Sequence, residues 1–360
     1  MLHSITQRTA LCAVALALFL GGCYRTDVLT PEVDGTPIDF DAGSCLLRDD
    51  ANTKATTDAF ISDEDAFVVF GEKVSVTDEH TSVFNGVTVN HDYQKEGNVV
   101  ITDSWHYTEL QYWKWSSQSD RYDFVAVSPA NIGTTKEVSQ GNLSVSTHYN
   151  YDNPGGGSPS GGDKYDILAS TYRRNGIDWD RRYDRVPLTF SHMGSAVAVT
   201  VANTSSSTNI TVTSIYYKNL VVSADAKVSL DNYGQTLLRW ANLIPSSAIV
   251  RKLAKEDPTD IGPGENYTGE YQIMIPQNLE LYEAQLYLTY KVGNNSNTIT
   301  SDPIPLSSIK RLDGTAITSW EIGYKYTYTV SMRLDGGLLV TVIPTPWDES
   351  VQGETPGILI

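Results

Sequence analysis

Short runs in which apolar and polar residues alternate recur along most of this 360-residue chain, and they are bounded by Gly, Asn, Asp or Ser. Alternation with a period of two sends successive side chains to opposite faces of a β-strand. The residues between the runs are those that favour tight turns. Nothing in the sequence resembles the regular alternation of strands and helices that a parallel α/β fold requires. The pattern therefore predicts an all-β protein.

The periodic runs give the following expectations. Strands are predicted at residues 38–42, 66–70, 82–90, 98–102, 107–115, 122–127, 196–201, 210–217, 271–275, 284–292, 297–300, 324–333 and 338–343. The spacing predicts hairpins between 196–201 and 210–217, across 290–298, and around the Gly-rich turn at 335–337. Residues 246–256 fit a single short helix.

The length of the chain favours more than one domain, because single cores usually stop growing near ~250–300 residues. A mixed-charge stretch at residues 173–185 separates two series of alternating runs. We therefore predict two packed β-sandwiches, an amino-terminal domain at 37–185 and a carboxy-terminal domain at 186–360.

The amino terminus carries an export signal. An apolar run at residues 10–20 follows Arg8 and precedes Gly21, Gly22 and Cys23. The run is too short to span a bilayer but has the length of a signal-peptide core. Residues 20–23 resemble the bacterial lipobox, which implies that residues 1–22 are removed and that the Cys23 thiol is acylated. The alternative is an ordinary signal peptide with a chance cysteine. Residues 23–36 lack periodicity and are predicted to tether the fold to the membrane through the lipid.

Charge and cysteine content exclude several classes of protein. The chain has 43 acidic and 26 basic residues, a net charge of −17, so it repels phosphate backbones and nucleic acid is not an expected partner. If Cys23 carries lipid, Cys45 is the only cysteine left after processing, because Cys12 lies in the signal. An internal disulfide and a cysteine-based zinc site are then both excluded.

The sequence nominates no catalytic residue, metal ligand or cofactor. Its histidines are dispersed, and neither a His-x-x-x-His pair nor a Gly-x-Ser-x-Gly motif is present. The acidic runs at 63–65 and 78–80 do not fit a calcium-binding loop. A pair of carboxylates for glycoside hydrolysis stays possible, because the separation of such a pair is set only in space. We expect a protein that is not an enzyme.

An aromatic cluster gives a competing hypothesis. Trp105, Trp113 and Trp115 lie close together in the sequence with Tyr107 and Tyr112. If exposed, these rings could stack on sugar faces and make the protein a surface glycan-binding lipoprotein. Trp113 and Trp115 would share one face of a strand, so at least one set of rings is expected in the core. Core packing is the preferred interpretation.

Several segments together resemble a known family. They are Asp-Phe-Val-Ala-Val-Ser-Pro at 123–129, Tyr-Asp-Ile-Leu-Ala at 165–169, Val-Pro-Leu-Thr-Phe-Ser-His-Met at 186–193, Trp-Glu-Ile-Gly-Tyr-Lys-Tyr-Thr-Tyr-Thr at 320–329, and Pro-Trp at 346–347. In this order, behind a lipobox, they are similar to the fimbrillin-like, or Mfa-like, lipoproteins, subunits of the type V pili of Bacteroidetes. The resemblance covers most of the chain.

The resemblance implies two transthyretin-like β-sandwiches in tandem and assembly by strand exchange with other fimbrial subunits. The family resemblance places the removable first strand at residues 38–47, and a protease would cut after Arg48 or Lys54 to release it. Loss of Ile38, Phe40 and Leu46 would expose apolar surface, whose burial stabilises the fold by about 1.5–3 kcal/mol per side chain. A strand from a neighbour would then fill the groove by β-augmentation. The implied location is the outer membrane and the surface fimbrium, with a host or bacterial surface ligand as a further partner.

Two departures bear on the role within the fimbrium. The tail at 351–360 is short for a donor strand, and residues 338–343 could donate only if the final hairpin opens. Lys54 stands where the family has Arg. The chain therefore fits an anchor or tip component as well as a shaft subunit. His192 matches a family position and is expected to make structural hydrogen bonds.

Overall fold

The structure is a computed structural model that describes residues 35–44, 65–96, 99–139, 141–150, 166–252, 259–269, 271–333 and 337–347. These residues form strands joined by turns, and the helical pieces among them are two 3₁₀ turns, Trp179–Arg181 and Leu306–Ser308. The predicted all-β fold is confirmed. Within the same residues, no helix is long and apolar enough to cross a membrane.

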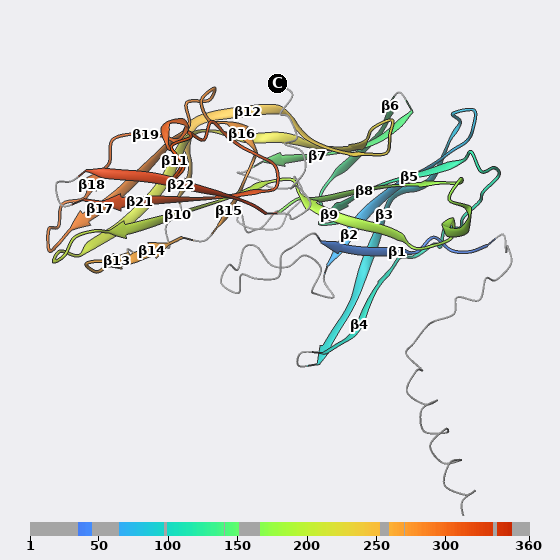
Figure 1. The fold of residues 1–360 in the computed structure, drawn as a ribbon, viewed down its shortest axis with the longest axis horizontal. Helices are drawn as coiled ribbons and strands as arrows, with labels where there is room; N and C mark the ends of the chain where they lie inside the picture. The colour runs from blue at the N-terminus through green and yellow to red at the C-terminus, as the bar shows by residue number, and fades with distance from the viewer. Residues whose placement is uncertain are drawn as a thin grey trace, which may run out of the picture.

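The first sheet occupies one end of the molecule, on the right in Figure 1. Its strand order is β1-β9-β8-β5-β2-β3-β4. The bounds are β1 Phe40–Ser44, β2 Ala66–Val74, β3 His80–Glu96, β4 Val99–His106, β5 Arg121–Ser128, β8 Leu168–Asn175 and β9 Val186–His192. The outer ends of β3 and β4 project from the body as a long hairpin (Figure 1).

The central strands of this sheet are buried on both faces. In β2, Phe67 and Val69 face one hydrophobic cluster, whereas Val68 and Phe70 face another. Strands buried on both sides have continuous apolar runs instead of strict alternation, which explains the sequence of β2. The first face packs against β1 and the aromatic residues near Trp113, and the second face packs against the second sheet.

The second sheet runs the length of the molecule (Figure 1). It contains β6 Thr134–Ser139, β7 Asn142–Asn150, β11 Ile210–Leu230, β12 Thr236–Lys252, β13 Thr259–Ile261, β17 Gln285–Val292, β18 Ile299–Thr300 and β19 Ile304–Pro305. The 21-residue β11 joins its two ends, because its first part pairs with β17 and its last part with β7. Irregular register and the positive φ of Asn219 (58°) mark the middle of this strand.

The third sheet packs on the part of the second sheet that contains β17 and the first part of β11. It contains β10 Ser195–Asn203, β14 Asn266–Thr268, β15 Gln272–Met274, β21 Tyr324–Met332 and β22 Leu338–Pro346, while β16 Gln277–Asn278 pairs separately with β20 Ser319–Trp320. The core between the two sheets includes Val199, Ile215, Leu288 and Tyr328, all at most 1% exposed.

Several predicted strands and hairpins are confirmed, including the antiparallel pair β21 and β22 and the β17–β18 hairpin. The predicted hairpin of 196–201 with 210–217 is wrong. Strand β10 pairs in parallel with β21, and β11 enters a different sheet. Each strand finds a better partner far away in the sequence, as is common when strands cross between two packed layers.

Two local predictions are also wrong. Residues 107–115 contain one isolated bridge, between Tyr112 and Pro37, and form no strand. The helix predicted at 246–256 is absent from the described residues 246–252, which are the end of β12 and pair with β11. Pairing with a long neighbouring strand overrides the weak local propensity for helix.

The predicted border between residues 185 and 186 does not coincide with a border between sheets. Strand β9 belongs by sequence to the carboxy-terminal range, yet it pairs with β8 and β1. Strand β7 belongs to the amino-terminal range, yet it pairs with β11. The tandem arrangement of domains that fold on their own stays a prediction.

Candidate assembly site

Strand β1 stands at the end of the first sheet, and within the described residues it pairs with one neighbour. It runs parallel to β9, with Phe40 opposite Val186 and Ser44 opposite Phe190. The curvature of the sheet brings β1 beside β4, the strand at the other end of the strand order. The indole Nε1 of Trp105 on β4 donates a hydrogen bond to the carbonyl of Ala42 over 3.2 Å. Strand β1 therefore fills the space between β9 and β4.

The residues just before β1 are held by a second segment. The amide of Ile38 donates to the carbonyl of Gln111 over 2.8 Å, and the amide of Trp113 donates to the carbonyl of Thr36 over 3.0 Å. The segment that makes these bonds also contributes Tyr107, Trp113 and Trp115 to the aromatic core. Hydrogen bonds from two separate parts of the chain thus fix residues 36–44.

A buried tyrosine adds a side-chain hydrogen bond to the same segment. The hydroxyl of Tyr107 donates to the carbonyl of Ile38 over 2.7 Å. Burial raises the pKa of Tyr107 to about 12, a hydrogen bond with the Gln111 backbone acts in the opposite direction, and the nearby Asp39 carboxylate raises the pKa further. The phenol is therefore neutral, and able to donate, throughout the physiological pH range.

Phe40 places the only ring of β1 at the centre of the aromatic cluster. The side chain is 3% exposed, and that of Ile38 is fully buried. Four rings lie at edge-on angles with centroids 5.4 to 6.1 Å from that of Phe40: Phe67, Phe84, Tyr107 and Phe124. Edge-on aromatic pairs at this spacing contribute about 0.5–1.5 kcal/mol each beyond their buried area. The inward face of β1 is thus part of the core.

The structure describes only some of the residues that the sequence assigned to this site. Ile38 and Phe40 lie in the core as described. Leu46, both candidate cleavage residues Arg48 and Lys54, and the candidate lipid-bearing Cys23 lie outside the described residues. Their assigned roles stay predictions.

The three tryptophans proposed as glycan contacts do not form an exposed platform. Trp113 is 1% exposed, and its ring stacks on that of Trp115 with centroids 5.6 Å apart. Trp105 stacks on His91 with centroids 4.3 Å apart, and Trp105 and Trp115 both pack against the core beneath β1. Trp113 is buried, as the preferred core interpretation expected, and has no exposed face for a glycan. Trp105 and Trp115 are partly buried, and a glycan contact at these two rings stays a prediction.

The last described strand is also an end strand. Strand β22 pairs with β21, and its outer side meets residue 310 at Thr341 and Val342. Leu339 and Ile343 on this strand are 56% and 45% exposed.

After β22, the chain is held by a contact with the first sheet. Trp347 is 2% exposed, and its ring stacks on that of His192 with centroids 3.7 Å apart. The Nδ1 of His192 is hydrogen-bonded to the carboxylate of Asp166. His192 is therefore a buried, hydrogen-bonded side chain, as its family position implied, and it joins the end of β9 to the residue that follows β22.

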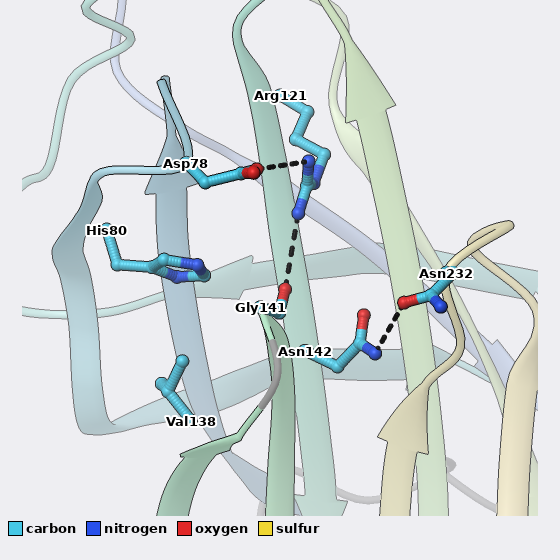
Figure 2. Close-up of a pocket in the computed structure, with 7 residues that line it drawn as sticks. All are labelled: Asp78, His80, Arg121, Val138, Gly141, Asn142 and Asn232. Carbon is cyan, nitrogen blue, oxygen red and sulfur yellow. Dashed lines mark hydrogen bonds and ion pairs between the residues drawn. The ribbon is translucent and has the colours of Figure 1, made fainter. Parts of the chain in front are cut away.

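A concave site lies where turns and strand ends of the first and second sheets meet (Figure 2). It is an open cleft of about 440 Å³ between the β2–β3 turn, the start of β5, the β6–β7 turn and the β11–β12 turn. Its lining residues are Asp78, His80, Arg121, Val138, Gly141, Asn142 and Asn232. The guanidinium of Arg121 lies 3.8 Å from the Asp78 carboxylate and donates to the Gly141 carbonyl over 3.2 Å.

Beneath this cleft, two arginines hold one buried carboxylate. Asp123 is fully buried, and Arg173 donates to its two oxygens over 2.6 and 3.0 Å. The Nε of Arg121 donates to the same carboxylate over 3.3 Å. Arg173 also donates to the backbone carbonyl of Asn232 over 3.0 Å. This network fixes the position of two cleft residues, Arg121 and Asn232.

Sequence reasoning did not identify the cleft. Asp78, Arg121, Asn142 and Asn232 come from separate turns, and each is an ordinary turn or strand-end residue by itself. It also did not identify the contacts of Thr36 and Gln111 with the strand segment. Backbone hydrogen bonds between irregular segments leave no periodic signal, so nothing in the sequence pointed to these residues.

The fold and the candidate site together define an all-β protein whose amino-terminal strand completes an aromatic core. The model of the fimbrillin-like family matches residues 53–347. Because the match covers most of the chain, this protein belongs to the fimbrillin-like family. The expectation drawn from the sequence motifs, a fimbrial subunit of this family, is confirmed at that level.

Three solved structures illustrate the similarity. A candidate cell adhesion protein from Bacteroides uniformis is 16% identical, with a TM-score of 0.43 over 88% of this chain and 99% of that one. The tip fimbrial protein Mfa3 from Porphyromonas gingivalis is 10% identical, with a TM-score of 0.38 over 80% and 96%. The fimbrial anchor protein Mfa2 from the same organism is 10% identical, with a TM-score of 0.28 over 86% and 98%. None of the curated proteins compared with this chain matches it.

Proposed function

We propose that this protein is a lipid-anchored subunit of a surface fimbrium that joins other subunits by strand complementation. It acts through protein–protein contacts and adhesion, without catalysis. The observation that carries the proposal is the position of residues 38–44. Within the described part of the chain, β1 pairs with β9 alone, and Phe40 in β1 and Ile38 just before it are core residues. A segment of this kind is held well enough to complete the precursor, and its removal exposes a groove.

Removal of β1 would leave unpaired backbone groups as well as apolar surface. The edge of β9 would lose its parallel partner, and Trp105 and Tyr107 would lose carbonyl acceptors at Ala42 and Ile38. An open edge beside an apolar groove favours the addition of another strand. Because donor and groove lie on different parts of the subunit, the contact is head-to-tail and extends into a filament.

Limited proteolysis tests the trigger. Trypsin should cut the purified precursor once between Ser44 and Asp65, after Arg48 or Lys54, and the trimmed protein should form multimers that grow with concentration. Single and double R48A and K54A variants assign the cut, and the double variant should stay intact and monomeric. R239A, a change on exposed strand β12, serves as the matched control and should behave as wild type. A trimmed protein that loses residues 35–44 and stays monomeric would refute the proposal.

The lipid anchor is tested separately. C23S should abolish incorporation of labelled palmitate and release the protein from the membrane fraction, whereas C45S should change neither. Equal labelling of wild type and C23S would exclude Cys23 as the acylated residue.

The donor strand has two candidates, the tail at 351–360 and β22. Strand β22 supports the second, since it is an end strand with Leu339 and Ile343 exposed. Deletion of 351–360 distinguishes them. Trimmed protein that still multimerises without the tail would favour β22 as the donor, and loss of multimers would favour the tail.

A further inference from the structure

We propose that the cleft lined by Asp78, Arg121, Asn142 and Asn232 binds a neutral sugar unit of a surface glycan (Figure 2). The site is distinct from the groove under β1, so this inference does not depend on strand complementation. It lies at the end of the first sheet where several turns meet, an arrangement in which a rigid scaffold presents binding residues on loops. Its volume of about 440 Å³ is in the range of small-ligand sites.

The charges of the cleft disfavour an ion as the ligand. Arg121 is the cation in the lining, and it is already bonded to Asp123 and to the Gly141 carbonyl. The Arg121 guanidinium therefore already has acidic and carbonyl partners. An anion in the cleft would also be repelled by the Asp78 carboxylate and by the net charge of −17. A metal ion would find too few ligands, because the described residues contain no group of three or more acidic, His or Cys side chains suited to one.

The hydrogen-bonding groups fit a ligand that both donates and accepts. Asn142 donates from Nδ2 to Oδ1 of Asn232 over 2.8 Å, which leaves the carbonyl oxygen of Asn142 and the NH₂ group of Asn232 for other partners. The Asp78 side chain is 81% exposed and supplies a further acceptor. Acceptors and a donor within one cleft match the hydroxyl groups of a sugar, each of which can donate and accept.

The cleft lining contains one apolar side chain, and the turn that carries Asn232 also carries an exposed aromatic ring. Val138 in the lining is 42% exposed. Tyr233 follows Asn232 at the tip of the β11–β12 turn and is 88% exposed, which is unusual for a ring of this size. The turn is rigid, because Asp231 accepts hydrogen bonds from the amides of Tyr233 and Gln235 over 2.8 and 2.7 Å. An exposed aromatic ring on a fixed turn is suited to the C–H face of a sugar.

His80 provides an independent indication of a missing partner. Both of its ring nitrogens are buried, and neither has a hydrogen-bond partner within the described residues. Buried polar groups are seldom left unpaired in native proteins. The His80 ring lines the cleft, and the residue as a whole is partly buried (Figure 2).

A binding assay with the full-length protein tests the inference. The probe is an array of neutral oligosaccharides ending in glucose, galactose, mannose, fucose or N-acetylhexosamines, with sialylated and sulfated glycans in parallel. We expect binding to at least one neutral class. N142A and N232A should each weaken it roughly three- to tenfold, the effect of losing one or two hydrogen bonds. Y233A should weaken it to a similar degree, and H80Q should shift the affinity in the same direction.

Matched controls separate a binding role from a folding role. N90A removes an exposed amide on β3, and H106Q changes an exposed imidazole on β4; both should bind as wild type. Two-dimensional NMR of the wild type titrated with the bound sugar should shift the His80 ring signals and leave those of His106 in place. Absence of neutral-glycan binding by wild type, preference for the charged glycans, or equal binding by N142A, N232A and wild type would overturn the inference. None of these results would affect multimer formation after trimming.

Discussion

Replacing Phe40 with alanine tests whether β1 is a structural part of the first sheet. The ring is 3% exposed and contacts four other rings, so its removal leaves a cavity at the centre of the aromatic cluster. Phe-to-Ala changes at such positions cost about 3–5 kcal/mol of folding free energy. We expect F40A to lower the free energy of unfolding of the uncut precursor by this amount.

The matched control is D41A, since Asp41 is the next residue of β1 and its side chain is exposed. A surface change of this kind should stay within about 0.5 kcal/mol of wild type. Denaturant unfolding followed by tryptophan fluorescence measures both variants, because Trp105 and Trp113 lie in the same cluster as Phe40. A loss below about 1 kcal/mol for F40A, or equal losses for the two variants, would refute the placement of β1 in the core.

The same substitution distinguishes retention from release after proteolysis. If trimmed precursor keeps the cut segment by non-covalent contacts, F40A should speed its release by roughly 10²- to 10³-fold or more, the rate equivalent of about 3–5 kcal/mol. Mass spectrometry of the trimmed protein over time measures that rate. Identical release from F40A and D41A would show that the ring does not hold the segment.

Three further predictions concern other parts of the fold. Y107F removes the hydrogen bond to Ile38 and should cost about 1–3 kcal/mol of folding free energy near neutral pH. Because the folded pKa of Tyr107 is raised to about 12, the stability that this phenol contributes is full below pH ~10 and is lost as the pH rises toward 12. The denaturation curves of wild type and Y107F should therefore converge as the pH approaches 12. The pKa of Asp120 shifts in the opposite direction. Burial alone would raise this pKa, but the Ser116 amide and the Lys73 ammonium hold it below the ordinary value. D120N should therefore be less stable than wild type at pH 7, and the difference in stability should shrink as the pH falls below about 4. W347A should raise hydrogen exchange in β22 while W347F largely preserves protection, and equal protection in all three proteins would contradict a role for the Trp347 stack in holding this strand.

Local pattern was a good guide to where strands lie and a poor guide to what they pair with. The run at 196–201 and the run at 210–217 are both strands, yet they belong to different sheets. Period-two alternation states which face of a strand is apolar, but it carries no information on the neighbouring strand. The parallel pairing of β1 with β9, more than 140 positions later, was invisible for the same reason.

Residues 107–115 show the limit of composition. Their aromatic, strand-like content predicted a strand, whereas the structure has an irregular segment whose amides and carbonyls bond to residues 36–38. The burial of Trp113 was expected from its size and spacing, but its stacking on Trp115 and its contact with Tyr122 depend on the curvature of the whole sheet. The cleft at Asp78 and Asn232 needed the same information, because it exists only where four separate segments meet.

By itself, the sequence determined the all-β class, most strand positions, and the motifs that place the chain in the fimbrillin-like family. These properties depend on residue type and short-range spacing. Only the tertiary structure decided that β1 lies between β9 and β4, that Phe40 sits among four rings, and that the polar side chains of distant turns share one cleft. Those properties follow from long-range strand pairing and sheet curvature, which balance many weak contacts across the whole chain and leave no local mark in the order of residues.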